Sequence, residues 1–191
     1  MIYGTAKNTL NGKISINENR EARIDSSTHS LQVMQYPHHE IHSEDTYRCF
    51  SNKDIPNAGT YNIAFTTPDT LKYINFTFTI DHELEADFKM YENVTSWTGG
   101  TPVTPLNANR NSLNSSGITD MTSDVIATLG TPVIMIHEVG GSGKKFGGSA
   151  THENEWILKR NTTYYLVLTN QGAGTSESNF QLDWYEHEDK N

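Results

Sequence analysis

The chain has 191 residues, of which 35% are hydrophobic and 10% aromatic, and its formal net charge at pH 7 is −9. This length fits one domain, two at most, with one hydrophobic core, and the aromatic content is too high for a disordered chain. The negative charge would repel a phosphate backbone, so we expect no nucleic-acid partner. Cys49 is the single cysteine; it cannot form an intrachain disulfide, and we expect it to be a small buried side chain.

The first thirty residues are polar and weakly patterned, with candidate short strands at Ile14–Ile16 and at Ile24. We interpret residues 1–30 as an N-terminal arm or extension that lies on a neighbouring subunit, with a mobile tail as an equal alternative. These residues do not have the pattern of a secretory signal. No apolar run in the sequence is long enough for a membrane helix. We therefore expect synthesis in a cytoplasm and no membrane partner.

Residues 31–191 form the expected main domain, and their first half alternates between apolar and polar residues. This period-2 pattern predicts strands at Leu31–Tyr36, Thr46–Ser51, Tyr61–Thr66, Ile74–Asp81 and Ala86–Tyr91. Pro37 interrupts the first of them, and residues 52–59 are predicted to be a loop. The strand at Ile74–Asp81 has one apolar and one polar face, so it should cover a core on one side only.

The segment Ser96–Gly117 is rich in Gly, Pro, Asn and Ser and predicts a long loop with one short strand. Loops of this length usually have a function or bind a partner. Beyond it, Val125–Leu129 is a candidate strand, and the apolar run Pro132–Val139 predicts a central strand buried on both faces. Residues 140–149 form a glycine-rich loop.

Three further strands are predicted near the C-terminus, at Trp156–Lys159, Tyr164–Thr169 and Phe180–Tyr185, with a polar loop at Asn170–Ser178. The aromatic cluster so close to the terminus indicates that the last strand is docked in a sheet. No helical period is sustained over ten residues anywhere. The pattern predicts an all-β fold, an antiparallel β-sandwich that is jelly-roll-like.

The segment His38–His42 (HHEIH) contains candidate metal ligands, His38, His39 and His42. It is not an H-E-x-x-H motif, because Ser43 stands where the second His would be. In an extended chain His38 and His42 would be roughly 13 Å apart at their Cα atoms, too far to chelate one ion. We expect a turn that enters a strand, with no metal, and keep a metal-dependent hydrolase as a remote alternative.

Two other polar segments predict no chemistry. Residues 140–145 (GGSGKK) lack the spacing of a phosphate-binding loop. The acidic cluster at residues 183–189 is expected to be a solvated edge, with Asp183 accepting hydrogen bonds from a turn. We therefore expect no catalytic residues, no cofactor and no enzymatic activity.

Several segments, in this order, resemble one family of virion structural proteins of tailed double-stranded DNA bacteriophages. They are THSLQVMQYPHHEIHSEDTY (28–47), TPLNANRNS (within 101–112), the glycine loop followed by ENEWILKRNTTYYLVLTN (140–170), and DWYEHE (183–188). The resemblance implies a capsid decoration protein, also called an auxiliary or cement protein, with a β-sandwich fold and commonly a homotrimer at threefold positions. It implies no catalytic residues.

On this basis we expect a non-enzymatic protein on the virion head surface, made in the host bacterial cytoplasm, that binds the major capsid protein and itself. Interface candidates are the N-terminal arm and exposed residues of the two long loops: Trp97, Pro102, Val103, Arg110, Lys144 and Phe146. The alternative is a tail- or fibre-associated adhesin or carbohydrate-binding module. In that case Tyr91, Trp97 and Trp184 would stack on sugar rings.

Overall fold

The structure is a computed structural model that describes residues 13–16, 20–23, 36–139 and 155–188. The chain divides into two units, residues 1–39 and 40–191. The first unit contains a two-stranded antiparallel hairpin of β1 (Lys13–Ile16) and β2 (Arg20–Arg23). The strand expected at Ile14–Ile16 is confirmed, while Ile24 and residues 31–35 lie outside the described part. The role of residues 1–30 as an arm remains a prediction.

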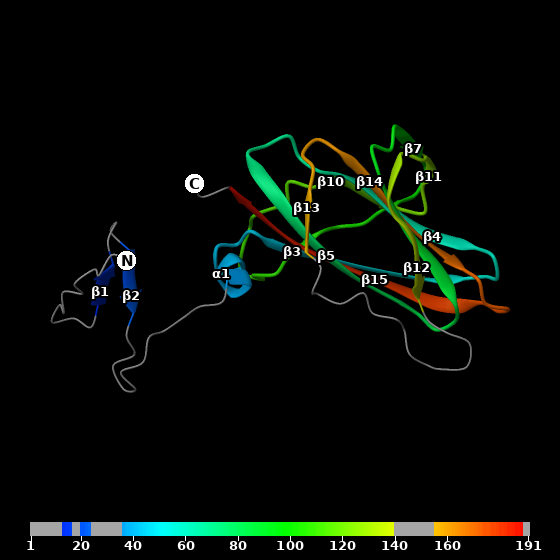
Figure 1. Cartoon of the computed structure of the whole chain (residues 1–191), viewed down its shortest axis with the longest axis horizontal. Coiled ribbons are helices and arrows are strands. Elements are labelled where there is room, and N and C mark those ends of the chain that lie inside the picture. The colour runs from blue at the N-terminus through cyan, green and yellow to red at the C-terminus, as the bar shows by residue number, and fades with distance from the viewer. Residues whose placement is uncertain (1–12, 17–19, 24–35, 140–154, 189–191) are drawn as a thin grey trace, which may run out of the picture. The chain divides into compact units, whose positions relative to one another are not determined.

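Two antiparallel sheets pack face to face in the second unit, so the predicted all-β sandwich is confirmed (Figure 1). The five-stranded sheet has the order β13 (Trp156–Leu158), β5 (Lys72–His82), β15 (Ser176–Glu188), β3 (Thr46–Ile55) and β9 (Leu106–Asn107). The six-stranded sheet has the order β12 (Thr131–Val139), β6 (Ala86–Glu92), β14 (Thr163–Asn170), β4 (Thr60–Thr66), β10 (Thr119–Ser123) and β8 (Thr101–Pro102).

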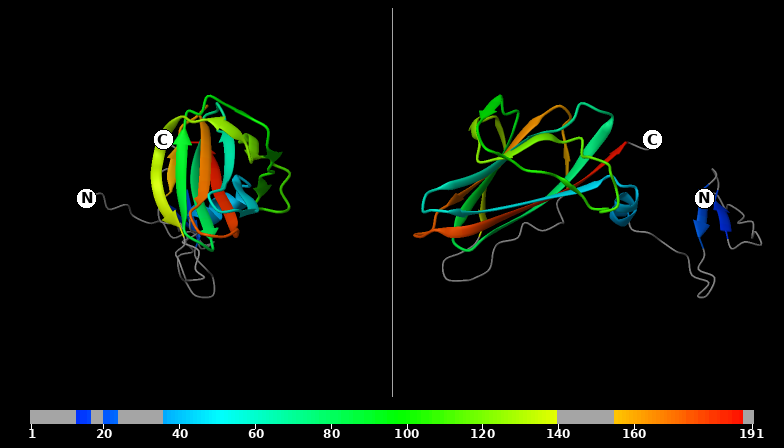
Figure 2. Two further views of the ribbon diagram at one scale, coloured as in Figure 1. Left: turned by 90° about the vertical axis from the view of Figure 1, so that its right-hand side faces the viewer. Right: turned by 180° about the vertical axis from the view of Figure 1, so that it is seen from behind.

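Eight strands of the sandwich pass back and forth between the two sheets. Strands β3, β4, β5 and β6 lie alternately in the five- and six-stranded sheets, and β12, β13, β14 and β15 alternate in the same way. Only the step from β6 to β12 stays in one sheet, where these two strands are neighbours. Figure 2 shows the sandwich from its end and from behind.

The core lies between the sheets and is built from the apolar side chains that alternate along each strand. Aromatic rings from opposite sheets meet there: Phe65 and Phe76 have centroids 5.6 Å apart, and Phe180 lies 5.3 Å from Tyr61 and 6.5 Å from Phe88. All five side chains are almost completely buried. Period-2 alternation placed them correctly because one face of each strand packs on the other sheet.

Three structural predictions were wrong. Strand β12 is an edge strand, paired only with β6 among the described residues, and Pro132 is exposed. An apolar run cannot distinguish an edge from a central strand, whereas a proline, which has no N–H, favours the edge.

Strand β3 continues to Ile55, through much of the expected loop, because it pairs with β15 over ten residues. Residues 36–42 form a short helix, α1 (Tyr36–His42), in which Pro37 occupies the first turn, where a missing N–H costs nothing.

The segment predicted as one long loop contains three short strands. They are β8, β9 and β7 (Ser96–Thr98), and β7 pairs with β11 (Ile126–Thr128) in a two-stranded ribbon. We call this pair the β7–β11 ribbon. Within the described residues, no helix is long and apolar enough to cross a membrane.

Candidate interaction surfaces

The outer face of the six-stranded sheet is largely covered. Its residues Ala64, Tyr165 and Val167 are buried in a second apolar cluster, separate from the main core, with Val94 and Val125. Trp97 and Ala127 of the β7–β11 ribbon pack against this cluster. The ribbon therefore closes much of this face of the sheet, while Ile126 of the ribbon and Leu129 just beyond it are themselves exposed.

The outer face of the five-stranded sheet is open. Strand register places side chains in rows across it, because residues directly opposite on neighbouring strands share a face. One row joins Thr77, Asp183, Arg48 and Leu106, and the next two join Thr79, Gln181 and Phe50, and then Asp81, Asn179 and Asn52. Phe50 is 58% exposed and Ile157, at the β13 edge, is 67% exposed. No second layer covers these residues in the described part of the chain.

Polar contacts fix several side chains on this open face. The Arg48 Nε atom lies 3.1 Å from Asp183 Oδ1, and Gln181 Nε2 donates to Asp183 Oδ2 at 2.8 Å. The carboxylate of Asp183 is thus held by Arg48 of the neighbouring strand β3 and by Gln181 of its own strand, and not by a turn as expected from the sequence. Farther along the same face, Asn75 Nδ2 on β5 and His187 Nδ1 on β15 are 2.7 Å apart.

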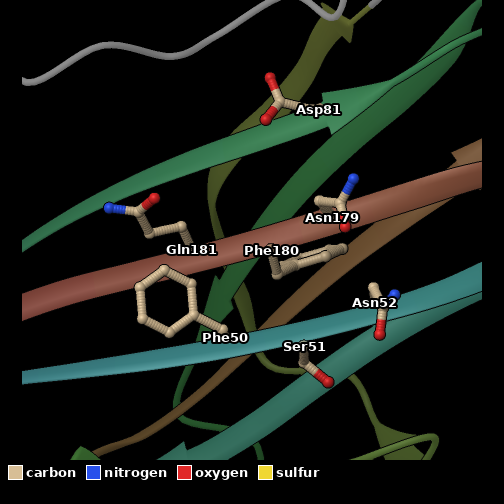
Figure 3. Close-up of a pocket in the computed structure, with 7 residues that line it drawn as sticks. All are labelled: Phe50, Ser51, Asn52, Asp81, Asn179, Phe180 and Gln181. Carbon is tan, nitrogen blue, oxygen red and sulfur yellow. The ribbon is translucent and has the colours of Figure 1, made fainter.

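A shallow hollow of about 280 Å³ lies on this face, over β3, β15 and β5. Its lining residues are Phe50, Ser51, Asn52, Asp81, Asn179, Phe180 and Gln181. Figure 3 shows Phe50 beside Gln181, with Asn179 and Asp81 on the two neighbouring strands. The Phe180 ring is 1% exposed and belongs to the core, and the Ser51 hydroxyl bonds to that of Tyr61. The remaining lining groups are one aromatic ring, three amides and one carboxylate.

The β9–β10 loop (residues 108–118) is held against the sandwich by a buried carboxylate. Glu186, on β15, is only 4% exposed. Its oxygens accept hydrogen bonds from Ser116 Oγ at 2.7 Å, Gly117 N at 2.9 Å and Trp184 Nε1 at 3.2 Å. The expectation of a solvated acidic edge was therefore wrong for Glu186. Its side chain points to the same inner side of β15 as that of Trp184, and several hydrogen-bond donors compensate for its lost hydration.

A second set of contacts fixes the start of the same loop. Asn107 Nδ2 donates to the Glu44 carbonyl at 2.7 Å, and Ser112 Oγ donates to Glu44 Oε2 at 2.7 Å. The Asn107 and Asn109 side chains accept hydrogen bonds from the backbone two residues ahead, at 2.9 and 3.1 Å. Side-chain hydrogen bonds of this kind stabilise turns without a regular ladder. Leu113 nevertheless remains 98% exposed on this ordered loop.

The six proposed interface residues do not share one environment. Pro102 and Arg110 are exposed, as expected. Val103 packs against the main core and Trp97 against the second cluster, so both contribute to the protein's own packing. Lys144 and Phe146 lie outside the described residues.

The proposed sugar-stacking trio does not form an exposed aromatic groove. Trp184 is 1% exposed and stacks on Tyr47 at 6.0 Å, while Tyr91 and Trp97 pack against the second cluster. Phe50 is the exposed aromatic ring that the sequence interpretation missed. In the period-2 pattern of this strand, Phe50 is on the opposite side from Tyr47 and Cys49, which are buried. This alternation indicates that Phe50 faces outward.

The histidine segment lies on helix α1 and not in an extended turn. Glu40 is 2% exposed, whereas His39 and His42 are exposed; the side chain of His38 is outside the described part. Over the described residues, no three His, Cys, Asp or Glu side chains are grouped closely enough to hold a metal ion.

Cys49 is fully buried, as predicted, on the inner face of β3. Burial, with a smaller effect from the negative charge of Asp183, raises the pKa of its thiol to about 12. Burial and the nearby carboxylates of Glu186 and Asp45 raise the pKa of Tyr47 to about 12. A buried thiol that holds its proton in this way is a poor nucleophile.

Comparison of the chain with protein-family models, with curated proteins and with solved structures found no match.

Proposed function

We propose that this chain is a non-enzymatic structural protein of a bacteriophage virion, a capsid decoration protein that binds the outer surface of the major capsid lattice and stabilises the head. The ordered β9–β10 loop is the observation that carries this proposal. Glu186 and Glu44 hold this loop in place, and an exposed Leu113 contributes little to the stability of the protein's own fold. Because its backbone is already ordered, it would lose little conformational entropy on binding.

The strand order supports the same proposal. When β8, β9 and β10 are left out, the two sheets have the orders β13-β5-β15-β3 and β12-β6-β14-β4. Along the chain, these eight strands change sheet at every step except β6 to β12. We infer that this is a jelly roll, in which two Greek keys form two four-stranded sheets. Jelly rolls are frequent in viral capsid proteins and in lectins, so the fold agrees with the proposal but does not establish the function.

The proposed contact surface is the exposed part of the β9–β10 loop, centred on Leu113 and Arg110. An exposed aliphatic side chain and an exposed guanidinium on one loop suit the core and rim of a protein interface. Several copies around a lattice threefold would form a closed homotrimer, as the resemblance implies. The positions of Lys144 and Phe146 in this contact remain a prediction.

Co-sedimentation with expanded capsids tests the proposal. The purified chain should saturate the capsids at a fixed stoichiometry. Leu113→Asp should weaken binding about tenfold or more, since it would place a charge in the apolar centre of the contact. Ile157→Asp is the matched control, because Ile157 is also an exposed aliphatic residue but lies on the sheet face. Absence of binding to expanded heads, or equal losses for the two variants, would contradict the proposal.

A further inference from the structure

The open face of the five-stranded sheet carries a group of side chains that the decoration function does not use. Asp81, Asn179 and Asn52 lie directly opposite one another on three neighbouring strands, and Gln181 and Phe50 form the adjacent row. With strands about 4.8 Å apart and rows roughly 7 Å apart, these five residues cover an area of about 10 by 7 Å. This area matches one sugar ring with its hydroxyl groups.

The side chains have the chemistry that a neutral sugar requires. An amide both donates and accepts hydrogen bonds, and a carboxylate accepts them, so together they satisfy hydroxyl groups, which do both. Among the described residues, the side chains of Asp81 and Asn179 make no hydrogen bond or ion pair. The Asn52 side chain reaches Glu177 only at 3.4 Å, and Gln181 uses one of its N–H groups on Asp183. The side chains of Asp81 and Asn179, and the remaining amide groups of Asn52 and Gln181, are therefore available to a ligand.

Phe50 supplies the apolar part of the same surface. Its ring is 58% exposed and lines the hollow together with the polar groups (Figure 3). A flat aromatic ring can cover the C–H face of a pyranose while amides bind the hydroxyl edge, which is the usual division of roles in a small-molecule site. Ile157, the exposed aliphatic residue on the same face, does not line the hollow, and its cross-strand neighbour Asn75 is already bonded to His187.

Charge argues against other ligands. The carboxylates of Asp81, Glu177 and Asp54 lie on or beside this area, and the whole chain carries a net charge of −9, so an anionic ligand would be repelled. A protein partner would need a larger apolar centre than a single ring. We propose that the surface formed by Phe50, Asn52, Asp81, Asn179 and Gln181 binds a neutral saccharide.

The hollow is shallow, so a single site should bind a monosaccharide only in the millimolar range. Many copies on one particle would strengthen attachment to a surface that repeats the same sugar. This inference is independent of the β9–β10 loop, so capsid binding and sugar binding can fail separately.

The test uses the ¹⁵N-labelled full chain and follows backbone amide shifts during titration with glucose, galactose, mannose and N-acetylglucosamine, each up to tens of millimolar. N-acetylneuraminic acid serves as the anionic comparison. At least one neutral sugar should shift the amides of residues 50, 179 and 181 in a saturable way, and the anionic sugar should not.

Two variants identify the site. Phe50→Ala should weaken the binding of that sugar at least about fivefold, since it removes the stacking ring. Asn179→Asp keeps the size of the side chain but removes its donors and adds a charge beside Asp81, so it should also weaken binding. Ile157→Ala, on the same face outside the hollow, should leave the affinity unchanged.

Four results would overturn the proposal: no saturable shift with any neutral sugar, wild-type affinity in Phe50→Ala, an equal loss in Ile157→Ala, or preferential binding of the anionic sugar. Loss of capsid binding in Phe50→Ala, without any sugar response in the wild-type chain, would assign this face to a protein contact instead.

Discussion

The two outer faces of the sandwich differ in what lies over them. On the six-stranded sheet, Tyr165 and Val167 are buried beneath residues that include Trp97 of the β7–β11 ribbon. On the five-stranded sheet, Phe50 and Ile157 are exposed, between polar side chains. The covered face adds a second apolar cluster to the protein's stability, and the open face contributes little to it. The open face is therefore free to carry groups selected for binding.

The largest expected effect comes from removing one ring on the covered face. Tyr165→Ala should lower the free energy of unfolding by about 3 kcal/mol, because it leaves a cavity in the second cluster. Phe50→Ala on the open face should change it by less than about 0.5 kcal/mol, because solvent already surrounds most of that ring. Urea denaturation of both variants measures the difference. Equal losses would mean that the two faces are not as different as their burial indicates.

A second test disturbs the attachment of the ribbon. Gly130 follows the ribbon strand β11, and a Cβ atom there would lie 2.0 Å from the Glu92 carbonyl oxygen, in a backbone that cannot easily move. Gly130→Ala should cost about 2 kcal/mol and loosen the covering of Tyr165.

Gly174→Ala is the control for this change, because its Cβ would meet only Leu84 Cδ1, at 4.0 Å. Thermal unfolding and the near-ultraviolet signal of the tyrosines should separate the two variants. An unchanged melting temperature in Gly130→Ala would show that the ribbon is not held by this close approach.

Stability at alkaline pH tests the buried side of strand β3, on which Cys49 faces the core, whereas Phe50 on the other side faces solvent. The folded chain keeps the Cys49 proton to a pKa of about 12, while a free thiol loses it near 9.0. The unfolded chain therefore binds fewer protons above pH 9. Stability should be complete below pH 9 and fall as the pH rises, by up to about 1.4 kcal/mol per pH unit.

Tyr47 adds a similar loss above its ordinary value of 10.0. Between pH 9 and 10 the loss should thus depend mainly on the thiol, and Cys49→Ala should flatten the curve in that interval. Urea midpoints at several pH values test this. A parallel decline in the wild type and in Cys49→Ala would contradict the assigned cause.

The smallest effect concerns the ion pair of Arg48 and Asp183 on the open face. The Arg48 side chain is 46% exposed, so solvent screens the pair. Arg48→Met should cost roughly 0.5 kcal/mol at low salt and less in concentrated salt. Denaturation at two ionic strengths measures this, and a cost above that of Gly130→Ala would mean that the open face matters more for stability than we infer.

Most of the fold could be predicted from sequence because its long strands have a single buried side. Phe76 and Ile80, and likewise Leu182 and Trp184, alternate with polar residues and point into the core as expected. The position of β12 at the edge of its sheet could not be predicted in this way, because its continuous apolar run does not alternate with polar residues. Helix α1 was missed because seven residues are too few to establish a helical period.

The candidate sites were harder to predict because they depend on which strands become neighbours. Asp81 and Asn179 are almost a hundred positions apart, and only the pairing of β5 with β15 brings them together. The burial of Glu186 likewise depends on a loop about seventy residues away. Local patterns identify a strand and its phase, but they do not specify its partners in the sheet.

Cryo-electron microscopy of the virion to which we propose this chain belongs tests the central claim most directly. We expect the sandwich on the outer surface of the head, with the β9–β10 loop around Leu113 against the major capsid protein and the open face with Phe50 turned to solvent. A location in the tail, or a head location in which the open face is buried against the capsid while Leu113 is free, would contradict this account.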